Sequence, residues 1–441
     1  MEETLGSQTV STKLERIAKM ARQVPARLTT LAHHIDIEWL REAHRRTRKD
    51  GARGIDGQSA EQYEQDLEEN LRSLLERAKA GTYHAPPVRR VYIPKGDGQQ
   101  RPLGIPTYED KVLQRAVAMM LEAVYEQEFL DCSYGFRPGR SAHQALGALR
   151  DAVMEMKGAW IVEVDIEKFF DTLDHEHLRN VLHQRIGDGV ILRLIGKWLH
   201  AGVMEDGNWK QSDSGTPQGG VASPILANIF LHEVMDKWFE REVKPRLKGR
   251  ATLVRFADDI AIAIEQEQDA QRVTEVLPKR FGKYGLKLHP EKTSRIRFQP
   301  PADNRKDDDD DGSGTATFDL LGFTHYWAKS ARGHWVVQVK TARRRLSSTL
   351  KRLSEWCRKN RHTSVAEQWK KLTAKLRGHF AYFGIIGNAK SLFVVKTAVY
   401  RIWRQWLNRR SQRARVTWAK MRLLHERYPL PRTPVLRSLR A

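Results

Sequence analysis

The sequence predicts an α+β fold, because short β-prone runs and longer helical patterns both occur along its 441 residues. Residues 161–165 alternate as a strand, and apolar runs at 253–254 and 260–264 flank a polar pair as in a β-hairpin. Apolar residues recur at helical spacing between 111 and 124 and in three segments beyond residue 345. A chain of this length exceeds a single hydrophobic core, so more than one domain is expected.

Local signals place the remaining elements of the N-terminal half. Residues 13–80 contain helical stretches around a turn-like segment at 51–57. Residues 88–93 alternate as a strand, and the Gly-Asp-Gly turn at 96–98 returns the chain as a hairpin. A further helix is expected to follow Asp174.

A helix is also expected to begin near Ser223. Serine is a favourable N-cap, and Pro224 suits the first helical position because its missing N–H has no partner there in any case. The helix would carry Leu226, Ile229 and Phe230 beneath the sheet.

Three aspartates stand at predicted strand ends. Asp258 and Asp259 occupy the hairpin tip, and Asp165 ends the strand at 161–165. An acidic tip is usually a solvated turn, since Asp favours turns. If the three carboxylates converge, however, they could hold Mg²⁺, which binds proteins through a few carboxylates plus substrate phosphates. Two such ions about 4 Å apart activate an attacking hydroxyl and stabilise the leaving oxygen, so the pattern indicates nucleotidyl transfer.

Short sequence blocks then extend this observation over residues 54–323. In chain order they are GIDG at 54–57, IPK at 93–95 with RPLGIP at 101–106, SYGFRPG at 133–139, IVEVDIEKFFD at 161–171, GTPQGG at 215–220 with SP at 223–224, FADD at 256–259, GLKL at 285–288 with EKT at 291–293, and LGF at 321–323. Each block alone is modest, but the ordered set is highly specific. The chain resembles the bacterial group II intron reverse transcriptases and maturases.

This resemblance implies a right-hand polymerase with fingers, a palm built on an antiparallel sheet, and a helical thumb. The corresponding regions would be an N-terminal extension at 1–85, fingers at 86–157, a palm at 158–325, a thumb or maturase domain at 326–410 and a basic nucleic-acid-binding segment at 411–441. Five consecutive aspartates at 307–311 lie in a polar stretch, 301–316, for which a disordered loop is expected rather than a catalytic role.

The resemblance also assigns roles to individual residues. Asp165, Asp258 and Asp259 would be the catalytic metal ligands for two Mg²⁺ ions, with Mn²⁺ as an alternative. The dNTP-binding residues would be Lys95 and Arg101 on the triphosphate, Phe170 under the deoxyribose, Gln218 and Gly219 in the Gly-rich turn, and Lys292 as proton donor to pyrophosphate. Each has an ordinary alternative: surface bases for Lys95, Arg101 and Lys292, a core side chain for Phe170, and a structural turn for Gln218 and Gly219.

The positive charge is concentrated at the C-terminal end. Residues 341–441 hold 26 Lys and Arg against three acids, whereas the other 340 residues hold 50 basic and 51 acidic residues. So uneven a distribution predicts a phosphate-binding surface rather than a solvated face. The tryptophans of the three predicted helices are expected in the core rather than as base-stacking platforms, and the phosphate contacts are expected from Arg401, Arg404, Arg409, Arg410, Arg413 and Arg415.

Several classes of protein are disfavoured. The two cysteines, Cys132 and Cys357, form neither a disulfide framework nor a Cys-x-x-Cys zinc motif. No apolar run approaches the roughly 18 residues of a membrane span, and residues 1–4 do not begin a signal peptide. A reduced, cytoplasmic protein without membrane partners is therefore expected. Because the chain ends before the endonuclease that many members of the family carry, no second-strand nuclease is expected.

The resulting functional prediction is an RNA-directed DNA polymerase that also binds group II intron RNA as a maturase. Its partners would be intron RNA, an RNA template with a DNA or RNA primer, dNTPs and a DNA target. Two alternatives remain open. The chain could be a non-catalytic RNA-binding splicing cofactor, or a polymerase of the same kind adopted by the host for defence or spacer acquisition.

Overall fold

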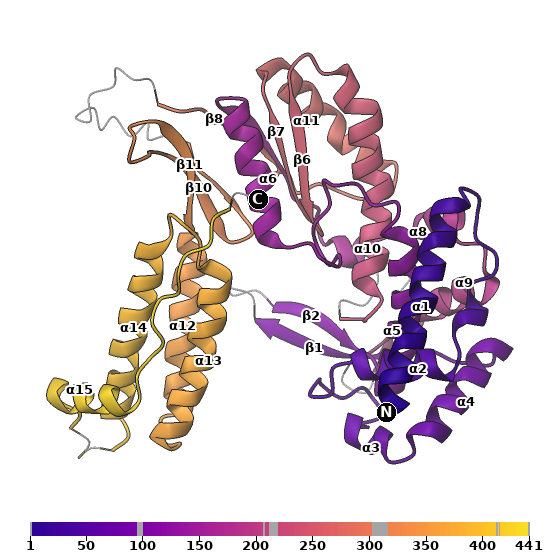
Figure 1. Cartoon of the computed structure of the whole chain (residues 1–441), viewed down its shortest axis with the longest axis horizontal. Helices are drawn as coiled ribbons and strands as arrows, with labels where there is room; N and C mark the ends of the chain where they lie inside the picture. Colours follow the sequence, from indigo (N-terminus) through magenta and orange to yellow (C-terminus); the bar gives the residue numbers. More distant parts are fainter. Residues whose placement is uncertain are drawn as a thin grey trace. The chain divides into compact units, whose positions relative to one another are not determined.

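The computed structural model describes residues 2–94, 100–205, 208–210, 219–301, 316–411, 413 and 415–439, which form a mixed α/β structure (Figure 1). The chain divides into two compact units. The first contains Met1–Ala145 and Ile161–Arg295, and the second contains Leu146–Trp160 and Ile296–Ala441. The prediction of helices combined with antiparallel strands is confirmed.

The first unit begins with helices, as residues 13–80 predict. Its helices are α1 (Glu2–Gln23), η1 (Ala32–His34), α2 (Ile37–Arg46), α3 (Ala60–Glu64), α4 (Leu67–Ala80), α5 (Tyr108–Tyr125), α7 (Phe169–Thr172), α8 (His175–Arg185), α9 (Gly189–Leu199), α10 (Ser223–Leu231) and α11 (Glu267–Gly282); η2 (His232–Lys237), η3 (Phe239–Val243) and η4 (Lys244–Arg246) follow α10. The prediction that a helix follows Asp174 is confirmed: the Asp174 carboxylate caps α8 by accepting the backbone N–H of His177 at 2.8 Å.

The expected hairpin after Pro86-Pro87 is present. Strand β1 (Val88–Pro94) pairs antiparallel with β2 (Gln100–Ile105), and Arg101 faces Ile93 in the register. The short strands β4 (Val203–Glu205) and β5 (Asn208–Lys210) complete a sheet in the order β2-β1-β4-β5. The expected Gly-Asp-Gly turn at 96–98 lies outside the described residues.

A second four-stranded sheet carries the aspartates. Its order is β6 (Ala251–Phe256), β7 (Asp259–Ile264), β3 (Ala159–Val164) and β8 (Ser294–Phe298). Strands β6 and β7 pair antiparallel with Phe256 opposite Asp259, which confirms the hairpin predicted from the flanking apolar runs (Figure 1). Helix α10 lies in the same unit and buries Leu226, Ile229 and Phe230, as expected.

The predicted N-cap of α10 is wrong by one residue. Helix α10 starts at Ser223, and its N-cap is Ala222, which has no capping side chain. The reason lies on another helix, because the Gln114 side-chain oxygen on α5 accepts the N–H groups of Val221 at 2.7 Å and Ala222 at 3.3 Å. An acceptor supplied by tertiary contact thus replaces the local cap.

The second unit combines a sheet with helices that lie side by side (Figure 1). Its helices are α12 (Arg343–Lys359), α13 (Val365–Phe383), α14 (Ala389–Asn408) and α15 (Trp418–Arg427), and helix α6 (Ala142–Glu155) spans the boundary between the units. The three helices expected beyond residue 345 are therefore confirmed. The sheet β11-β10-β9, formed by β9 (Phe318–Leu320), β10 (Phe323–Lys329) and β11 (Trp335–Thr341), was not predicted.

Buried polar side chains join the helices of the second unit. The Gln368 amide donates to the carbonyls of residues 360, 361 and 363 at 2.9, 3.2 and 3.0 Å, and its oxygen accepts the Trp403 indole N–H at 2.9 Å. Trp403 is fully buried, whereas Trp356, Trp369 and Trp406 are half-buried, so the expectation of core tryptophans holds fully for Trp403 alone among the tryptophans of α12–α14. The expected loop at 301–316 falls almost entirely outside the described residues. Within the described ranges, no helix combines the length and apolar character needed to span a bilayer.

His325 on β10 makes the second unit sensitive to acid. Its ring is fully buried and stacks on Phe318 with ring centroids 4.4 Å apart. Burial lowers the pKa of His325 to about 4 from an ordinary 6.5. The unfolded chain therefore takes up a proton near pH 6.5 that the folded chain does not bind until about pH 4. The contribution of His325 to the free energy of unfolding is therefore fully present above about pH 6.5. It is lost as the pH falls toward about 4, with a slope of up to about 1.4 kcal/mol per pH unit.

We expect His325→Phe to remove this part of the acid sensitivity. Thermal unfolding between about pH 7 and pH 5 should show a smaller loss of Tm for the variant than for the wild type. His362→Phe is the control, because His362 is exposed in the turn between α12 and α13 and should keep the wild-type slope. Parallel pH curves for His325→Phe and the wild type would contradict the assignment.

Candidate active site

The β6–β7 hairpin presents its two aspartates differently. Ala257 and Asp258 form the two-residue connection, and Asp259 is the first residue of β7. Ala257 has a positive φ of 57°, a conformation that a residue with a side chain adopts only when its surroundings hold it there. Asp258 is half-buried, whereas Asp259 is exposed. The tip is thus a constrained turn rather than a flexible acidic loop.

Asp165 is held at the end of β3 by the segment after α11. Its backbone carbonyl accepts the N–H of His289 at 2.8 Å, and its N–H donates to the Thr293 hydroxyl at 3.4 Å. The Lys292 ammonium lies 3.7 Å from the Asp165 carboxylate, with both side chains largely accessible to solvent. Residues 289–293, which include the EKT block, therefore fix Asp165 and place a cation beside it.

The carboxylates of Asp258 and Asp165 interact electrostatically. The pKa of Asp258 is raised, first by burial and further by the negative charge of Asp165, while the positive charge of Arg101 on β2 opposes the shift. A carboxylate whose ionisation is disfavoured by burial and by a neighbouring negative charge forms a site that a cation would stabilise. The fold thus brings Asp165 and Arg101 close enough for their charges to act on Asp258, although Arg101 lies 157 residues before Asp258 in the sequence.

The donor set suits Mg²⁺, although the protein alone does not assemble a complete cage. Across the described residues, no three or more His, Cys, Asp or Glu side chains are grouped as a ready-made metal site. Mg²⁺ needs no such cage, because it keeps several waters and binds through one or two carboxylates together with substrate phosphates. Asp165 and Asp258 provide oxygen ligands of this kind.

A fully buried arginine supports the turn between β6 and β7. The Arg255 guanidinium donates to both oxygens of Asp236 at 2.7 and 2.6 Å, to the Asn228 side-chain oxygen at 2.9 Å, to the Ser133 hydroxyl at 2.7 Å and to the carbonyl of Ala257 at 3.2 Å. Burial by itself would raise the pKa of Asp236, but the charge and hydrogen bonds of Arg255 outweigh it and hold this pKa below its usual value. The last bond of Arg255 reaches the residue with the positive φ.

Gly135 shows why the SYGFRPG block contains a glycine at this position. A Cβ atom on Gly135 would lie 2.4 Å from the backbone nitrogen of Ala257, so only glycine allows the turn to approach. The Gly135 carbonyl also accepts the Asn228 amide at 2.7 Å. The sequence predicted this block as a family motif but did not reveal that Gly135 makes room for the turn. The available signal was Arg255, the one charged residue of β6.

Other predicted residues lie at or near this unit's sheets and turns. Phe169 is buried and Phe170 half-buried, with their ring centroids 5.2 Å apart. Arg101 is exposed on β2. Gly219 has a φ of 116°, and a Cβ atom there would lie 2.7 Å from the Gly104 carbonyl. Lys95 and Gln218 lie outside the described residues.

The six C-terminal arginines fall into two groups. Arg404 donates to the Val416 carbonyl at 2.9 Å and covers the Trp418 ring at 3.9 Å, and Arg410 donates to the carbonyls of residues 361 and 363 at 2.5 and 2.6 Å. These two side chains join parts of the second unit. The side chains in the other group are exposed: Arg401, Arg409, Arg413 and Arg415.

Two families of known proteins match the chain. Residues 93–325 match the family described as reverse transcriptase (RNA-dependent DNA polymerase). Residues 346–424 match the group II intron, maturase-specific domain. The first match contains Arg101, Asp165 and the β6–β7 hairpin, and the second covers α13, α14 and most of α12.

Several curated proteins are similar to the chain. Group II intron-encoded protein LtrA of Lactococcus lactis subsp. cremoris is 45% identical over 189 residues, which cover 41% of this chain and 31% of LtrA. Protein YkfC of Escherichia coli K12 is 37% identical over 261 residues, 52% of this chain and 68% of that protein. A putative COX1/OXI3 intron 2 protein of Saccharomyces cerevisiae is 38% identical over 173 residues, 39% of this chain and 20% of that protein.

The aligned part thus spans about a third of LtrA and about two thirds of YkfC. The first family match alone covers more than half of the present sequence. The chain therefore belongs to the reverse transcriptase (RNA-dependent DNA polymerase) family and carries, after that region, a maturase-specific domain of group II intron proteins.

Proposed function

We propose that the chain is an RNA-directed DNA polymerase that also binds group II intron RNA as a maturase in splicing and mobility. The observation that carries the polymerase proposal is that two carboxylates, Asp165 and Asp258, are close enough to repel each other. Both lie inside the region that matches the reverse transcriptase family. The match of residues 346–424 to the maturase-specific domain supports the second activity.

The proposed architecture is a right hand. The hairpin β1–β2 belongs to fingers at 86–157, the sheet β6-β7-β3-β8 to a palm at 158–325, and α12–α14 to a thumb at 326–410. Residues 1–85 form an N-terminal extension, and residues 411–441 form a basic segment. The antiparallel β6–β7 hairpin, with aspartates at its tip, supports the assignment of the palm.

The proposed chemistry is a two-metal displacement in which a primer 3′-hydroxyl attacks the α-phosphate of a dNTP. Bound Mg²⁺ would lower the pKa of the hydroxyl and stabilise the leaving oxygen. Asp165 and Asp258 are the ligands that the electrostatics favour, and Asp259 is the third. Arg255 keeps the turn rigid, so that the Asp258 carboxylate is positioned before substrate binds.

The nucleotide would lie between the fingers hairpin and the catalytic turn. The positive charge of Arg101 acts on Asp258, which supports a role on the triphosphate, and Lys95 would act beside it. Phe170 would exclude a ribose 2′-hydroxyl, while Gln218 and Gly219 would contact the sugar or base. Lys292, 3.7 Å from Asp165, would protonate the leaving pyrophosphate.

Intron RNA and the template–primer duplex would bind through phosphate contacts. The exposed Arg401, Arg409, Arg413 and Arg415 present their side chains to solvent, whereas Arg404 and Arg410 already donate to backbone carbonyls and would contact phosphate with their remaining N–H groups. This RNA binding should weaken steeply with salt, because each neutralised phosphate releases counterions. A DNA target strand would be recognised by the same charge.

Primer extension on poly(rA)·oligo(dT) with Mg²⁺ tests the proposed polymerase. We expect dTTP to be incorporated, rUTP to be excluded by Phe170, and EDTA to stop the reaction. In a filter-binding assay, retention of labelled group II intron RNA by the protein at low but not at high salt would support the maturase assignment. Purified protein that binds RNA but incorporates no dTTP would contradict the polymerase and leave an RNA-binding cofactor.

A further inference from the structure

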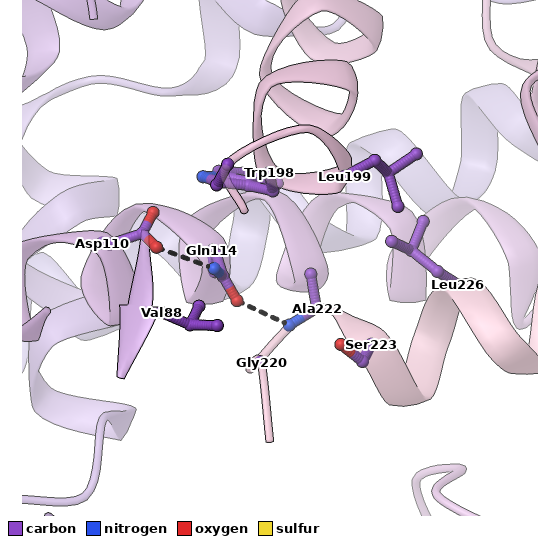
Figure 2. A pocket seen from close by; sticks show the side chains of 10 residues that line it. Val88, Asp110, Gln114, Trp198, Leu199, Gly220, Ala222, Ser223 and Leu226 are labelled. Carbon is purple, nitrogen blue, oxygen red and sulfur yellow. Dashed lines mark hydrogen bonds between the residues drawn. The ribbon is translucent and has the colours of Figure 1, made fainter. Parts of the chain in front are cut away.

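Three buried polar side chains connect the first unit's core to the start of α10. The Tyr83 hydroxyl donates to one oxygen of Asp110 at 2.5 Å, and the Gln114 amide donates to the other at 3.0 Å. The Gln114 oxygen in turn accepts the backbone N–H of Val221 at 2.7 Å and that of Ala222 at 3.3 Å. Figure 2 shows the bonds of Gln114 to Asp110 and to Ala222. Tyr83, Asp110 and Gln114 expose 1%, 2% and 5% of their surfaces, so water does not compete with these bonds.

This relay of Tyr83, Asp110 and Gln114 ends on a chain segment that contains the last two glycines of the Gly-rich block and the two residues after them. Gly219 begins this segment, and its backbone approaches the Gly104 carbonyl of β2 so closely that a Cβ atom would lie 2.7 Å from it. Residues 219–222 are therefore held by β2 at one end and by Gln114 at the other. The adjoining cavity, lined in part by Asp110, Gln114 and Gly220, measures about 20 Å³. That volume holds about one water, so the side chains have little room to move.

With Asp110 ionised, the donors and acceptors of the relay can be arranged in one way. A glutamine amide fits a site in two orientations, and its hydrogen-bond partners decide between them. Because the ionised Asp110 only accepts, the NH₂ group of Gln114 must face it, and the oxygen of Gln114 must face the N–H groups of Val221 and Ala222. Burial raises the pKa of Asp110 to about 6, and the charge of Glu109 acts in the same direction, so the carboxyl is ionised at about pH 8.

We propose that Asp110 and Gln114 are positioning residues for the backbone at 219–222, which includes the end of the Gly-rich block. The Asp110 carboxylate fixes the orientation of the Gln114 amide, and Gln114 fixes the backbone that sets the turn against β2. This inference rests on the proposed polymerase function, in which Gln218 and Gly219 contact the incoming dNTP. Neither relay residue touches the nucleotide. Their loss should therefore weaken dNTP binding, seen in KM, more than it slows the chemical step, seen in kcat.

Exchanging the carboxylate and the amide between positions 110 and 114 separates this positioning role from a general effect on packing. In Asp110→Asn, the new side chain has one accepting oxygen and cannot accept from both Tyr83 and Gln114. With its NH₂ group toward Gln114, it forces the NH₂ group of Gln114 toward the N–H groups of Val221 and Ala222. With its oxygen toward Gln114, it leaves the Tyr83 hydroxyl proton without an acceptor. In Gln114→Glu, two buried carboxylates face each other. The double variant Asp110→Asn/Gln114→Glu restores every match. Tyr83 then donates to the oxygen of the introduced amide, this amide donates to the introduced carboxylate, and the carboxylate accepts both backbone N–H groups.

We expect each single variant to raise KM for dTTP by about tenfold or more, in line with one or two mismatched buried hydrogen bonds, and to change kcat less. The double variant should return KM to within about threefold of the wild type. The control carries the same two changes at exposed neighbours, Gln65→Glu/Asp66→Asn, and should keep the wild-type KM. Circular dichroism and Tm of each variant report folding.

Two results would overturn the inference: single variants with the wild-type KM, or a double variant that is as impaired as the singles or does not fold. Amide hydrogen exchange at Val221 and Ala222 gives a readout that does not require polymerase activity. Exchange should accelerate in the singles and slow again in the double. If the wild type incorporates no dTTP, the proposed function fails, and unaltered exchange in the singles would then be the separate result that rejects the relay.

Discussion

Asp258→Ala should reduce cDNA synthesis by about 10³-fold or more while RNA binding stays near the wild-type level. A metal ligand contributes several kcal/mol of transition-state stabilisation, and each 1.4 kcal/mol or so corresponds to a factor of about ten in rate. The stability of the fold should not fall, because burial and Asp165 already disfavour the ionised form of Asp258. Single-turnover primer extension, filter binding of intron RNA and thermal unfolding measure the three quantities.

Asp258→Asn and Asp66→Asn make this test specific. The first keeps the size of the side chain and removes only its charge, so its activity should be lost as in Asp258→Ala. The second makes the same chemical change at an exposed residue of the same unit, where Asp66 makes no capping bond, and it should extend primers normally. Persistent polymerisation by Asp258→Ala would sink the catalytic assignment of the hairpin.

Arg255→Met should destabilise the first unit by about 3 to 5 kcal/mol and abolish primer extension. Removal of the guanidinium leaves the Asp236 carboxylate buried without its partner, which is the costly way to break a buried ion pair. It also removes the donor to the Ala257 carbonyl, so the positive-φ turn loses one of the contacts that hold it. Urea unfolding and primer extension report the two effects.

A double replacement separates stability from positioning. In Arg255→Met/Asp236→Leu, no buried charge of this pair remains unpaired, so much of the lost stability should return. Primer extension should stay low, because the Ala257 carbonyl still lacks its donor. Arg250→Met is the matched control at the other end of the hairpin, where the partly exposed pair with Glu265 contributes at most about 1 kcal/mol. Full activity in the double variant would contradict a positioning role for Arg255.

The hairpin and the helices were predictable because their signals are local. Two apolar runs around a polar pair define β6 and β7, and helical spacing defines α5, α12, α13 and α14. The ordered motif blocks predicted the family before any geometry was known, and the match over residues 93–325 confirms it. The roles of the dNTP-binding residues stay predictions.

Other features depend on contacts between residues distant in sequence. The cap of α10 comes from Gln114 on α5, 107 residues before Val221, so no local pattern could place it. Strands β10 and β11 were missed because the sequence beyond residue 325 was interpreted only as helical, although each strand alternates buried and more accessible residues. Arg404 and Arg410 looked like phosphate ligands by composition, whereas the fold directs them to backbone carbonyls.

The sequence by itself determined the β6–β7 hairpin, the helices with clear periodicity, the family and the three candidate aspartates, because periodicity, turn chemistry and motif order depend on neighbouring residues. Only the tertiary structure decided how the aspartates are held and coupled. Arg255 holds the turn and is itself fixed by hydrogen bonds to residues 133, 228 and 236. The charges of Asp165 and Arg101 act on the pKa of Asp258. Burial and electrostatic coupling depend on distances in space, and the spacing of residues along a chain does not supply those distances.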